Sequence, residues 1–356
     1  MRNYLLIMIS IIFLLIGCSN EKQEENSSQH EQPTNSNGNM EIIAQDLSVP
    51  WAIDWDGISF YISERTGSIV KITGDGKIRQ NLHLKKKLST APEAGVLGFV
   101  LHPEKRNYAF LYYTYEDKSG QFNRVVTIRE ENNEWFEEKV LLDRIPSGNF
   151  HHGGRIKIGP DKKLYITTGD ATDSMIAQDK TSLGGKILRM NLDGTIPDDN
   201  PYSNSLVYSY GHRNPQGLAW DETGKLYSSE HGSSAHDEIN LIQPKGNYGW
   251  PLIQGDETKD GMITPLFHSG NHTWAPSGIA YHNGVLYVAQ LRGEGILAFD
   301  LKNKTYKQVV SNVGRVRDVF ILEDHLFFVT NNTDGRGVPA NHDDKLIRIP
   351  IPKKAF

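Results

Sequence analysis

Apolar and aromatic residues recur in pairs along the chain, each inside a short stretch of strand-like sequence. The pairs begin 41 to 62 residues apart and are Phe60-Tyr61, Leu111-Tyr112, Leu164-Tyr165, Leu226-Tyr227, Leu286-Tyr287 and Phe327-Phe328. A second alternating or apolar segment follows each pair, at residues 68–72, 124–128, 186–190, 238–242, 295–299 and 345–349. Amphipathic helical stretches are nearly absent, so the pattern predicts a protein built from strands.

Turn residues introduce or follow several of these pairs. Residues 159–163, 221–225 and 282–284 contain Gly, Pro, Asn or Asp and suit tight hairpins. Six repeats of this length predict an all-β fold, the six-bladed β-propeller, because a ring of small sheets closes without long exposed edges. We expect residues 42–55 to complete the ring with the C-terminal segment. A β-sandwich or a parallel β-helix is the alternative.

The N-terminus has the pattern of a lipoprotein signal peptide over residues 1–17. A basic head precedes an apolar run at residues 4–16, which ends in Leu15-Ile16-Gly17-Cys18, the spacing of a lipobox. Cys18 is the only cysteine, so it cannot form a disulfide within the chain, and we expect it to carry lipid. The prediction is an extracytoplasmic protein, lipid-anchored to the cell membrane. An uncleaved anchor or plain secretion is the alternative.

The rest of the chain divides into a tether and one large domain. Residues 18–39 are predicted to be a disordered tether, because residues 19–39 hold no aliphatic or aromatic side chain. The propeller domain is then 40–356. A net charge of -5 without a dense Lys/Arg stripe argues against nucleic acid as a partner.

Polar, glycine-rich segments lie where ordinary connections between strands would be. His151, Asp170, Arg213 and Asn214 are suited to proton transfer and anion binding. The loops at one end of a propeller converge, so these residues can share a pocket with others at predicted blade edges: His231, Arg292, Arg315 and Arg317. Taken singly, Asp170 could simply cap a turn and Arg213 could form a surface ion pair.

Several ordered motifs resemble the soluble quinoprotein sugar dehydrogenases, the glucose/sorbosone dehydrogenase family. They are His151-x-Gly-Gly-Arg155, Gly159-Pro160-Asp161, Thr168-Gly169-Asp170, Gly211-His212-Arg213-Asn214-Pro215-Gln216-Gly217, Asp237-Glu238-Ile239-Asn240, Gly246-Asn247-Tyr248-Gly249-Trp250-Pro251 and Arg315-Val316-Arg317-Asp318-Val319. The resemblance spans residues 41–350. It implies a six-bladed propeller that binds pyrroloquinoline quinone (PQQ) and calcium and oxidises the C1 hydroxyl of an aldose to a lactone.

The resemblance also implies roles for the residues that match. His151 is similar to the family's catalytic base, Asp170 to the carboxylate that orients it, and Arg213 to the cation beside the quinone oxygen. Asn214 and Thr273 match cofactor contacts. Arg315 and Arg317 match the arginines that bind the cofactor's carboxylates, a task that suits the guanidinium fork. As an alternative, both would be solvated strand residues, either of them partnered by Asp318.

Calcium is implied at two places. Gly232 and Ser233 match positions whose backbone carbonyls hold the calcium that bridges to the quinone. Glu238 and Tyr248 resemble a second calcium site, through the carboxylate of Glu238 and the carbonyl of Tyr248. Oxygen donors suit this hard cation. The alternative is that Glu238 belongs to an ordinary acidic turn.

Three positions depart from the family pattern. Glu93, expected at the cofactor, stands where glucose oxidisers carry a glutamine. Arg292, also expected to bind the cofactor, replaces a lysine at the quinone, and His231 stands where a glutamine often occurs. The loops that form the sugar pocket are also short, so glucose itself is doubtful as the substrate. The partners expected are a sugar and an electron acceptor, either a membrane quinone or a soluble carrier, with the chain a monomer or a homodimer.

Two other functions stay open at this point. One is a non-catalytic cell-surface propeller that binds a ligand with a degenerate cofactor site. The other is a calcium-dependent sugar-lactone hydrolase, which the His-Gly-Gly-Arg and Arg-Asn-Pro-Gln-Gly runs do not fit. Retention of His151, Asp170 and Arg213 together favours the dehydrogenase.

Overall fold

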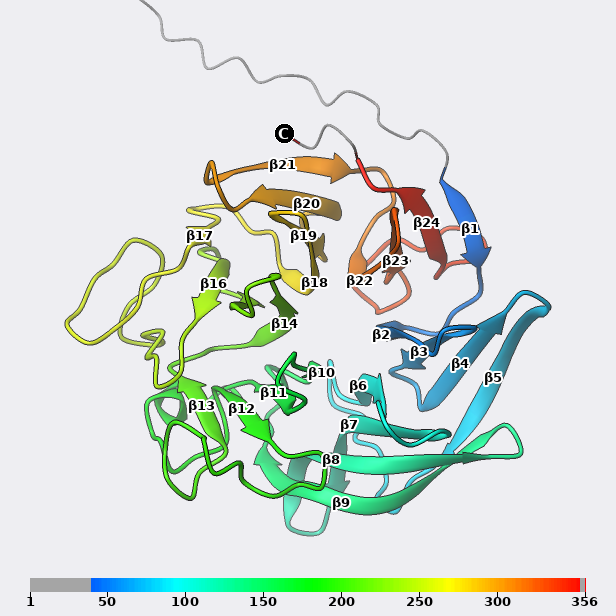
Figure 1. Cartoon of the computed structure of the whole chain (residues 1–356), viewed down its shortest axis with the longest axis horizontal. Coiled ribbons are helices and arrows are strands. Elements are labelled where there is room, and N and C mark those ends of the chain that lie inside the picture. Colours follow the sequence, from blue (N-terminus) through cyan, green and yellow to red (C-terminus); the bar gives the residue numbers. More distant parts are fainter. Residues whose placement is uncertain (1–39, 353–355) are drawn as a thin grey trace, which may run out of the picture. The chain divides into compact units, whose positions relative to one another are not determined.

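The computed structural model describes residues 40–352 and 356, and nearly all of their regular structure is β-strand. Six antiparallel four-stranded blades surround a central axis (Figure 1). The first two blades form one eight-stranded sheet, because β5 and β9 pair in parallel through Leu82 with Trp135 and His83 with Phe136. The only helical element in the described range is the 3-10 turn η1 (Ser174–Ala177). The predicted six-bladed propeller is confirmed.

The innermost strands of blades 1 to 6 are β2 (Pro50–Trp55), β6 (Val96–Leu101), β10 (Ile156–Ile158), β14 (Pro215–Trp220), β18 (Pro276–His282) and β22 (Val316–Leu322). The second strands are β3 (Phe60–Glu64), β7 (Tyr108–Asp117), β11 (Leu164–Thr168), β15 (Leu226–Glu230), β19 (Val285–Gln290) and β23 (His325–Thr330). All six apolar-aromatic pairs lie in these second strands, as the repeat predicted.

The third strands contain the second segment of each predicted repeat. They are β4 (Ser68–Thr73), β8 (Gly120–Glu131), β12 (Lys186–Met190), β16 (Glu238–Ile242), β20 (Gly295–Asp300) and β24 (Leu346–Pro350). The outermost strands are β5 (Gly76–His83), β9 (Glu134–Pro146), β13 (Val207–Tyr210), β17 (Phe267–His268), β21 (Thr305–Val310) and β1 (Glu41–Ala44).

The ring is closed in blade 6, where strands from both ends of the described chain pair. Strand β1 is the outer strand of this blade and pairs antiparallel with β24. The expectation that residues 42–55 as a whole would close the ring is wrong in one respect. Residues 50–55 form β2, the inner strand of blade 1, so the turn between Ala44 and Pro50 carries the chain from the last blade to the first.

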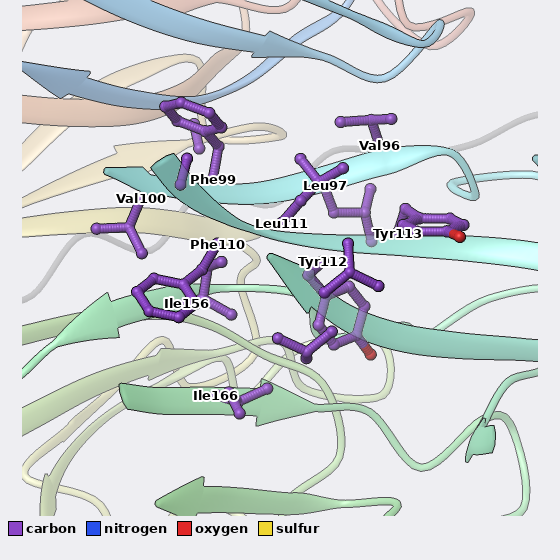
Figure 2. Packing of buried hydrophobic residues seen from close by; sticks show 14 of the residues in the cluster. Val96, Leu97, Phe99, Val100, Phe110, Leu111, Tyr112, Tyr113, Ile156 and Ile166 are labelled. Atoms are coloured by element: carbon purple, nitrogen blue, oxygen red, sulfur yellow. The ribbon is translucent and has the colours of Figure 1, made fainter. Parts of the chain in front are cut away.

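Apolar side chains fill the space between neighbouring blades. Figure 2 shows this packing around β6 and β7, whose side chains contact Ile156 and Ile166 of blade 3. Strand β6 is buried along nearly its whole length because other blades cover both of its faces. Strand β5, at the rim, is mostly exposed. Burial therefore decreases from the axis outward.

Glycines allow the inner strands to approach each other closely. A Cβ on Gly98 would lie 2.2 Å from the carbonyl oxygen of Gly154 in the next blade. A Cβ on Gly217 would lie 2.5 Å from the carbonyl oxygen of Ser277. Both distances are far below van der Waals contact, so only glycine fits at these places.

The antiparallel register brings many remote segments to one mouth of the propeller. The start of each inner strand pairs with the end of the second strand, as Pro50 does with Glu64 and Pro215 with Glu230. Five of the six inner strands also have a register shift near this end. Such bulges redirect side chains next to binding sites. The loops that lead into the inner strands and the loops that follow the second strands therefore meet at this mouth.

The predicted signal peptide, the predicted lipidation site at Cys18 and the predicted tether lie outside the described residues. Within residues 40–352 there is no helix of the length and apolarity needed to cross a membrane.

Candidate functional site

A histidine–aspartate pair lies at this mouth. His151 comes from the loop that leads into β10, and Asp170 from the loop that follows β11. The Nδ1 atom of His151 is 2.7 Å from Oδ1 of Asp170. An ionised carboxylate only accepts hydrogen bonds, so Nδ1 carries the proton and Nε2 keeps its lone pair. The His151 side chain is 18% exposed and that of Asp170 is 2% exposed, so the pair presents an accessible base on a buried support.

Trp250 holds the other oxygen of Asp170. Its indole Nε1 donates to Oδ2 of Asp170 at 2.8 Å. The backbone of Trp250 is fixed in turn, because its N–H donates to Gly211 and its carbonyl accepts from Gln178. The indole ring also lies 5.3 Å from the guanidinium of Arg213. Trp250 therefore contacts both Asp170, which holds His151, and the cation of Arg213.

Arg213 and Asn214 lie in the loop that leads into β14. The carbonyl of Arg213 accepts the N–H of Asp170 at 2.8 Å, and Oδ1 of Asn214 accepts the N–H of Gly153 at 3.0 Å. Burial lowers the pKa of Arg213, while the carboxylates of Asp170 and Glu230 oppose that effect. Its Nε is buried without a hydrogen-bond partner in the described structure.

His231 provides a second unpartnered nitrogen beside this loop. Its Nε2 is buried and has no hydrogen-bond partner among the described residues. Burial lowers the pKa of His231 to about 4, although nearby Asp237 and Glu93 act in the opposite direction. The imidazole is therefore neutral at physiological pH. Its Nε2 is then free to donate to, or accept from, a bound group, depending on the tautomer.

Arg315 and Arg317 converge on one carboxylate, that of Asp334 in the loop after β23. Nη2 of Arg315 lies 2.7 Å from Oδ2 of Asp334, and Nη2 of Arg317 lies 3.8 Å from the same oxygen. Asp318, the partner considered from the sequence, instead binds the buried Arg155 at 2.9 Å. Both cofactor candidates are largely buried, which contradicts the alternative of solvated strand residues.

Glu93 is neutralised by a residue of blade 6, Arg336. Nη1 of Arg336 donates to Oε1 of Glu93 at 2.6 Å. Burial alone would raise the pKa of Glu93, but Arg336, with His231 and His152 nearby, lowers it to about 2. Glu93 is therefore ionised and paired at neutral pH. A narrow hollow beside it is lined by Trp51, Arg65, Glu93, Leu97, His152, Gly153, Gln216, His231, Leu291, Arg317 and Arg336.

Asp237 joins two segments that the sequence predicted for calcium and cofactor. Its Oδ1 accepts the N–H of Gly232 at 2.9 Å. Its Oδ2 accepts the hydroxyl of Thr273 at 2.8 Å and the N–H groups of the next two residues. The hydroxyl of Thr273 is thus used to fix the loop. Ser233 is exposed, and its hydroxyl donates to Gln254.

Glu238 and Tyr248 have different surroundings. The carboxylate of Glu238 accepts only an amide N–H of Asn240 and a long 3.4 Å contact from the N–H of Gly255. Burial and the nearby carboxylate of Glu230 raise the pKa of Glu238 to about 8. The Tyr248 hydroxyl is bound to Leu241 and Gln243, so only its backbone is available to a metal. No group of three or more His, Cys, Asp or Glu side chains within the described range is arranged to hold a metal.

The structure thus brings most of the predicted residues together, with Arg292 as an exception. Arg292, in the turn after β19, is exposed, and its backbone N–H donates to the carbonyl of Trp274. Sequence reasoning also missed Trp250, Asp334 and Arg336. Trp250 lies inside a recognised motif, and the other two lie in Asn331-Asn332-Thr333-Asp334-Gly335-Arg336-Gly337, a polar, glycine-rich run of the kind that revealed the other loops.

The chain matches known proteins over nearly all of the propeller. The family model described as Glucose / Sorbosone dehydrogenase matches residues 47–347. Quinoprotein glucose dehydrogenase B of Acinetobacter calcoaceticus is 34% identical over 270 residues, which are 66% of this chain but only 56% of that protein. An aldose sugar dehydrogenase of Escherichia coli is 26% identical over 346 residues, covering 83% of this chain and 91% of that protein.

A solved structure shows the same agreement in three dimensions. The PQQ-bound aldose sugar dehydrogenase of Streptomyces coelicolor superposes with a TM-score of 0.82 at 35% identity, covering 88% of this chain and 98% of that one. The fold, the ordered motifs and the family match agree, and the chain belongs to the glucose/sorbosone dehydrogenase family.

Proposed function

We propose that the protein is a PQQ- and calcium-dependent dehydrogenase that oxidises the C1 hydroxyl of an aldose to the lactone. The observation that carries this proposal is the His151–Asp170 pair, in which Asp170 is held by Trp250, whose ring also contacts the cation of Arg213. Similarity to a PQQ-bound aldose sugar dehydrogenase supports the same activity.

The charges at the mouth suit a polyanionic quinone. Arg65 and Arg317 line the hollow, and Arg315 lies beside Arg317 on the shared Asp334. The buried Nε of Arg213 and Nε2 of His231 supply polar atoms that no protein group satisfies within the described structure. Arginine forks suit carboxylates and quinone oxygens. When bound, PQQ would supply the hydride acceptor.

The chain's own residues would then divide the remaining work. Nε2 of His151 would take the proton of the sugar hydroxyl as a hydride leaves the carbon that bears this hydroxyl. Asp170 stabilises the imidazolium that forms and fixes its tautomer. The guanidinium of Arg213 stabilises the negative charge that develops beside it during transfer. Proton and hydride together account for the two hydrogens that the sugar loses.

Glu238 is the side chain that best fits calcium. Its carboxyl group receives little support from the contacts at Asn240 and Gly255, and a hard cation would displace the proton that the raised pKa retains and bind the carboxylate. Gly232 and Ser233 would contribute backbone carbonyls at a separate calcium beside the quinone.

Reconstitution tests the activity. The 40–356 fragment would be titrated with PQQ and calcium and assayed by dye reduction across a panel of aldoses. We expect calcium-dependent quinone binding and sugar-dependent reduction. A folded protein that binds no quinone would overturn the proposal and favour a non-catalytic binding propeller.

Calcium binding has its own test, in which the chelator-treated fragment is compared with the calcium-loaded one. At about 100 times its dissociation constant, calcium should add roughly 3 kcal/mol to the free energy of unfolding. The Glu238→Gln variant should lose part of that gain. An identical gain in both proteins would contradict the assignment of Glu238.

We also propose that the enzyme is attached outside the cytoplasm through lipid on Cys18 and passes electrons to a membrane quinone or a soluble carrier. The lipobox spacing of Leu15-Ile16-Gly17-Cys18 supports this. Metabolic labelling with a radioactive fatty acid should mark the full chain and leave Cys18→Ser unlabelled. Equal labelling of both would contradict the anchor.

A further inference from the structure

Three loops from different blades meet beside the proposed base. The first is the turn before β6, which contains Glu93. The second is the loop before β10, which contains Phe150, His151 and His152. The third is the loop after β23, which contains Arg336. Hydrogen bonds and ring contacts between these loops connect blade 6 to the base.

The turn before β6 holds the His151 loop at two points. Oε2 of Glu93 accepts the N–H of His151 in a long contact of 3.4 Å. The carbonyl of Pro92 lies 3.2 Å from Nε2 of His152. Glu93 and His151 both have a φ of 65°, a left-handed conformation that is costly for residues with a side chain. Two strained residues in contact need support from their surroundings.

Arg336 supplies a support from outside both loops. Its guanidinium binds Oε1 of Glu93 at 2.6 Å and lies 5.7 Å from the ring of Phe150, the residue before His151. Its own backbone N–H donates to Oδ1 of Asp334 at 2.9 Å. Oδ2 of the same Asp334 binds Arg315. A short chain of contacts therefore runs from the cofactor arginines to the base.

We propose that Arg336 and Glu93 form a clasp that positions His151, so that Arg336 is a positioning residue for the reaction. The inference rests on the proposed dehydrogenase function for its kinetic part only. Glu93 thus supports the base through the backbone and is not a second base. The clasp also explains why a carboxylate is tolerated where glucose oxidisers carry a glutamine, because Arg336 is present to pair with that carboxylate.

The kinetic test is a double-mutant cycle with Arg336→Gln, Glu93→Gln and the double variant, each reconstituted with PQQ and calcium. Each single change should lower kcat about 10-fold, because small misplacements of a reacting group are costly. The double variant should fall about 10-fold as well, since either change already opens the clasp. Arg336→Lys should retain an intermediate kcat. Quinone affinity should change less than threefold.

A second measurement does not depend on turnover. Amide hydrogen exchange over residues 147–154 in the quinone-free protein should accelerate in both single variants and equally in the double variant. Arg129→Gln is the matched control. It removes a partly exposed ion pair between Arg129 on β8 and Glu138 on β9. It should leave both kcat and this exchange unchanged. Failure of the wild type to oxidise any sugar would refute the dehydrogenase and leave the exchange test intact.

Three results would overturn the clasp. Unchanged exchange in both single variants would show that the pair supports nothing. A roughly 100-fold loss of kcat in the double variant would show two independent roles. A normal kcat at saturating quinone with weak quinone binding in Arg336→Gln would make Arg336 a cofactor ligand instead.

Discussion

Single side chains at the mouth are held by more than one contact, and Asp170 is the clearest example. Its Oδ1 binds the imidazole of His151 and the N–H of Thr172, while Oδ2 binds the indole of Trp250. These three donors fix the orientation of the carboxylate. The residue next to the proposed base is therefore itself positioned by a residue that the sequence did not single out.

Removing the indole donor should slow catalysis. In Trp250→Phe, Asp170 loses one of the hydrogen bonds that fix its orientation, so His151 is held less precisely and kcat should fall about 10-fold. Steady-state kinetics of the reconstituted proteins would measure this fall. Trp220→Phe, which changes an indole in β14 away from the pair, serves as the control. An unchanged kcat in Trp250→Phe would contradict a role for the donor.

The stability contributed by Glu93 should depend on pH in a defined window. In the folded protein the pKa of Glu93 is lowered from its ordinary value of 4.5 to about 2. The unfolded chain therefore binds a proton at Glu93 more readily than the folded protein does. The stabilisation is therefore complete above pH 4.5 and is lost as the pH falls toward 2. Arg336, Arg65, His152 and His231 are the charged or titratable groups that face this carboxylate.

Urea unfolding of wild type and Glu93→Gln would measure this dependence. Arg336 is half exposed, so the pair should contribute no more than about 1 kcal/mol at pH 6. The difference between the two proteins should shrink at pH 3. A difference that stays constant between pH 6 and pH 3 would show that the ionisation of Glu93 does not stabilise the fold.

At the level of elements, the inner strands depend on glycine for close contact between blades. Gly217→Ala would place a Cβ 2.5 Å from the carbonyl oxygen of Ser277 on β18, and backbone cannot move away cheaply. We expect a loss of roughly 2 to 3 kcal/mol in the free energy of unfolding. Gly74→Ala is the control, because nothing lies within 4 Å of its Cβ position. Equal stability of the two variants would contradict this account.

The strands were predictable because their signal is local. Each apolar-aromatic pair lies in a second strand whose neighbours bury both of its faces. Burial therefore requires apolar or aromatic side chains at consecutive positions, which can be read from a short stretch of sequence. The division of residues 42–55 was not predictable from that signal. β1 and β2 are both strand-like, and only the pairing of β1 with β24 separates them into different blades.

The candidate site was predictable from sequence motifs, and only for the residues that lie in them. His151, Asp170 and Arg213 lie in motifs that could be matched position by position. Asp334 and Arg336 lie in the loop after β23 and bind side chains of other loops, Arg315 and Glu93. No local pattern reveals which charged residue in one loop faces which in another, so the alternative that paired Asp318 with one of the arginines missed its actual partner, Arg155.

For the whole molecule, ring closure by β1 should contribute to stability. Strand β1 adds its backbone hydrogen bonds to β24, and Leu47 just after it pairs with Asp344 through two backbone hydrogen bonds. A chain that starts at residue 48 should therefore unfold at a temperature lower by about 5 °C or more than one that starts at residue 40. Calorimetry of the two fragments decides this, and equal midpoints would show that closure is dispensable.

The two mouths of the ring differ in what they offer to protein engineering. The loops of one mouth carry the proposed chemistry, whereas the hairpins between inner and second strands turn at the other end. Gly224 and Gly284 in two of those hairpins have open space around them. An electrode linker or a fused electron carrier attached there would leave the residues of the reactive mouth untouched, so immobilised enzyme would face its sugar with that mouth outward.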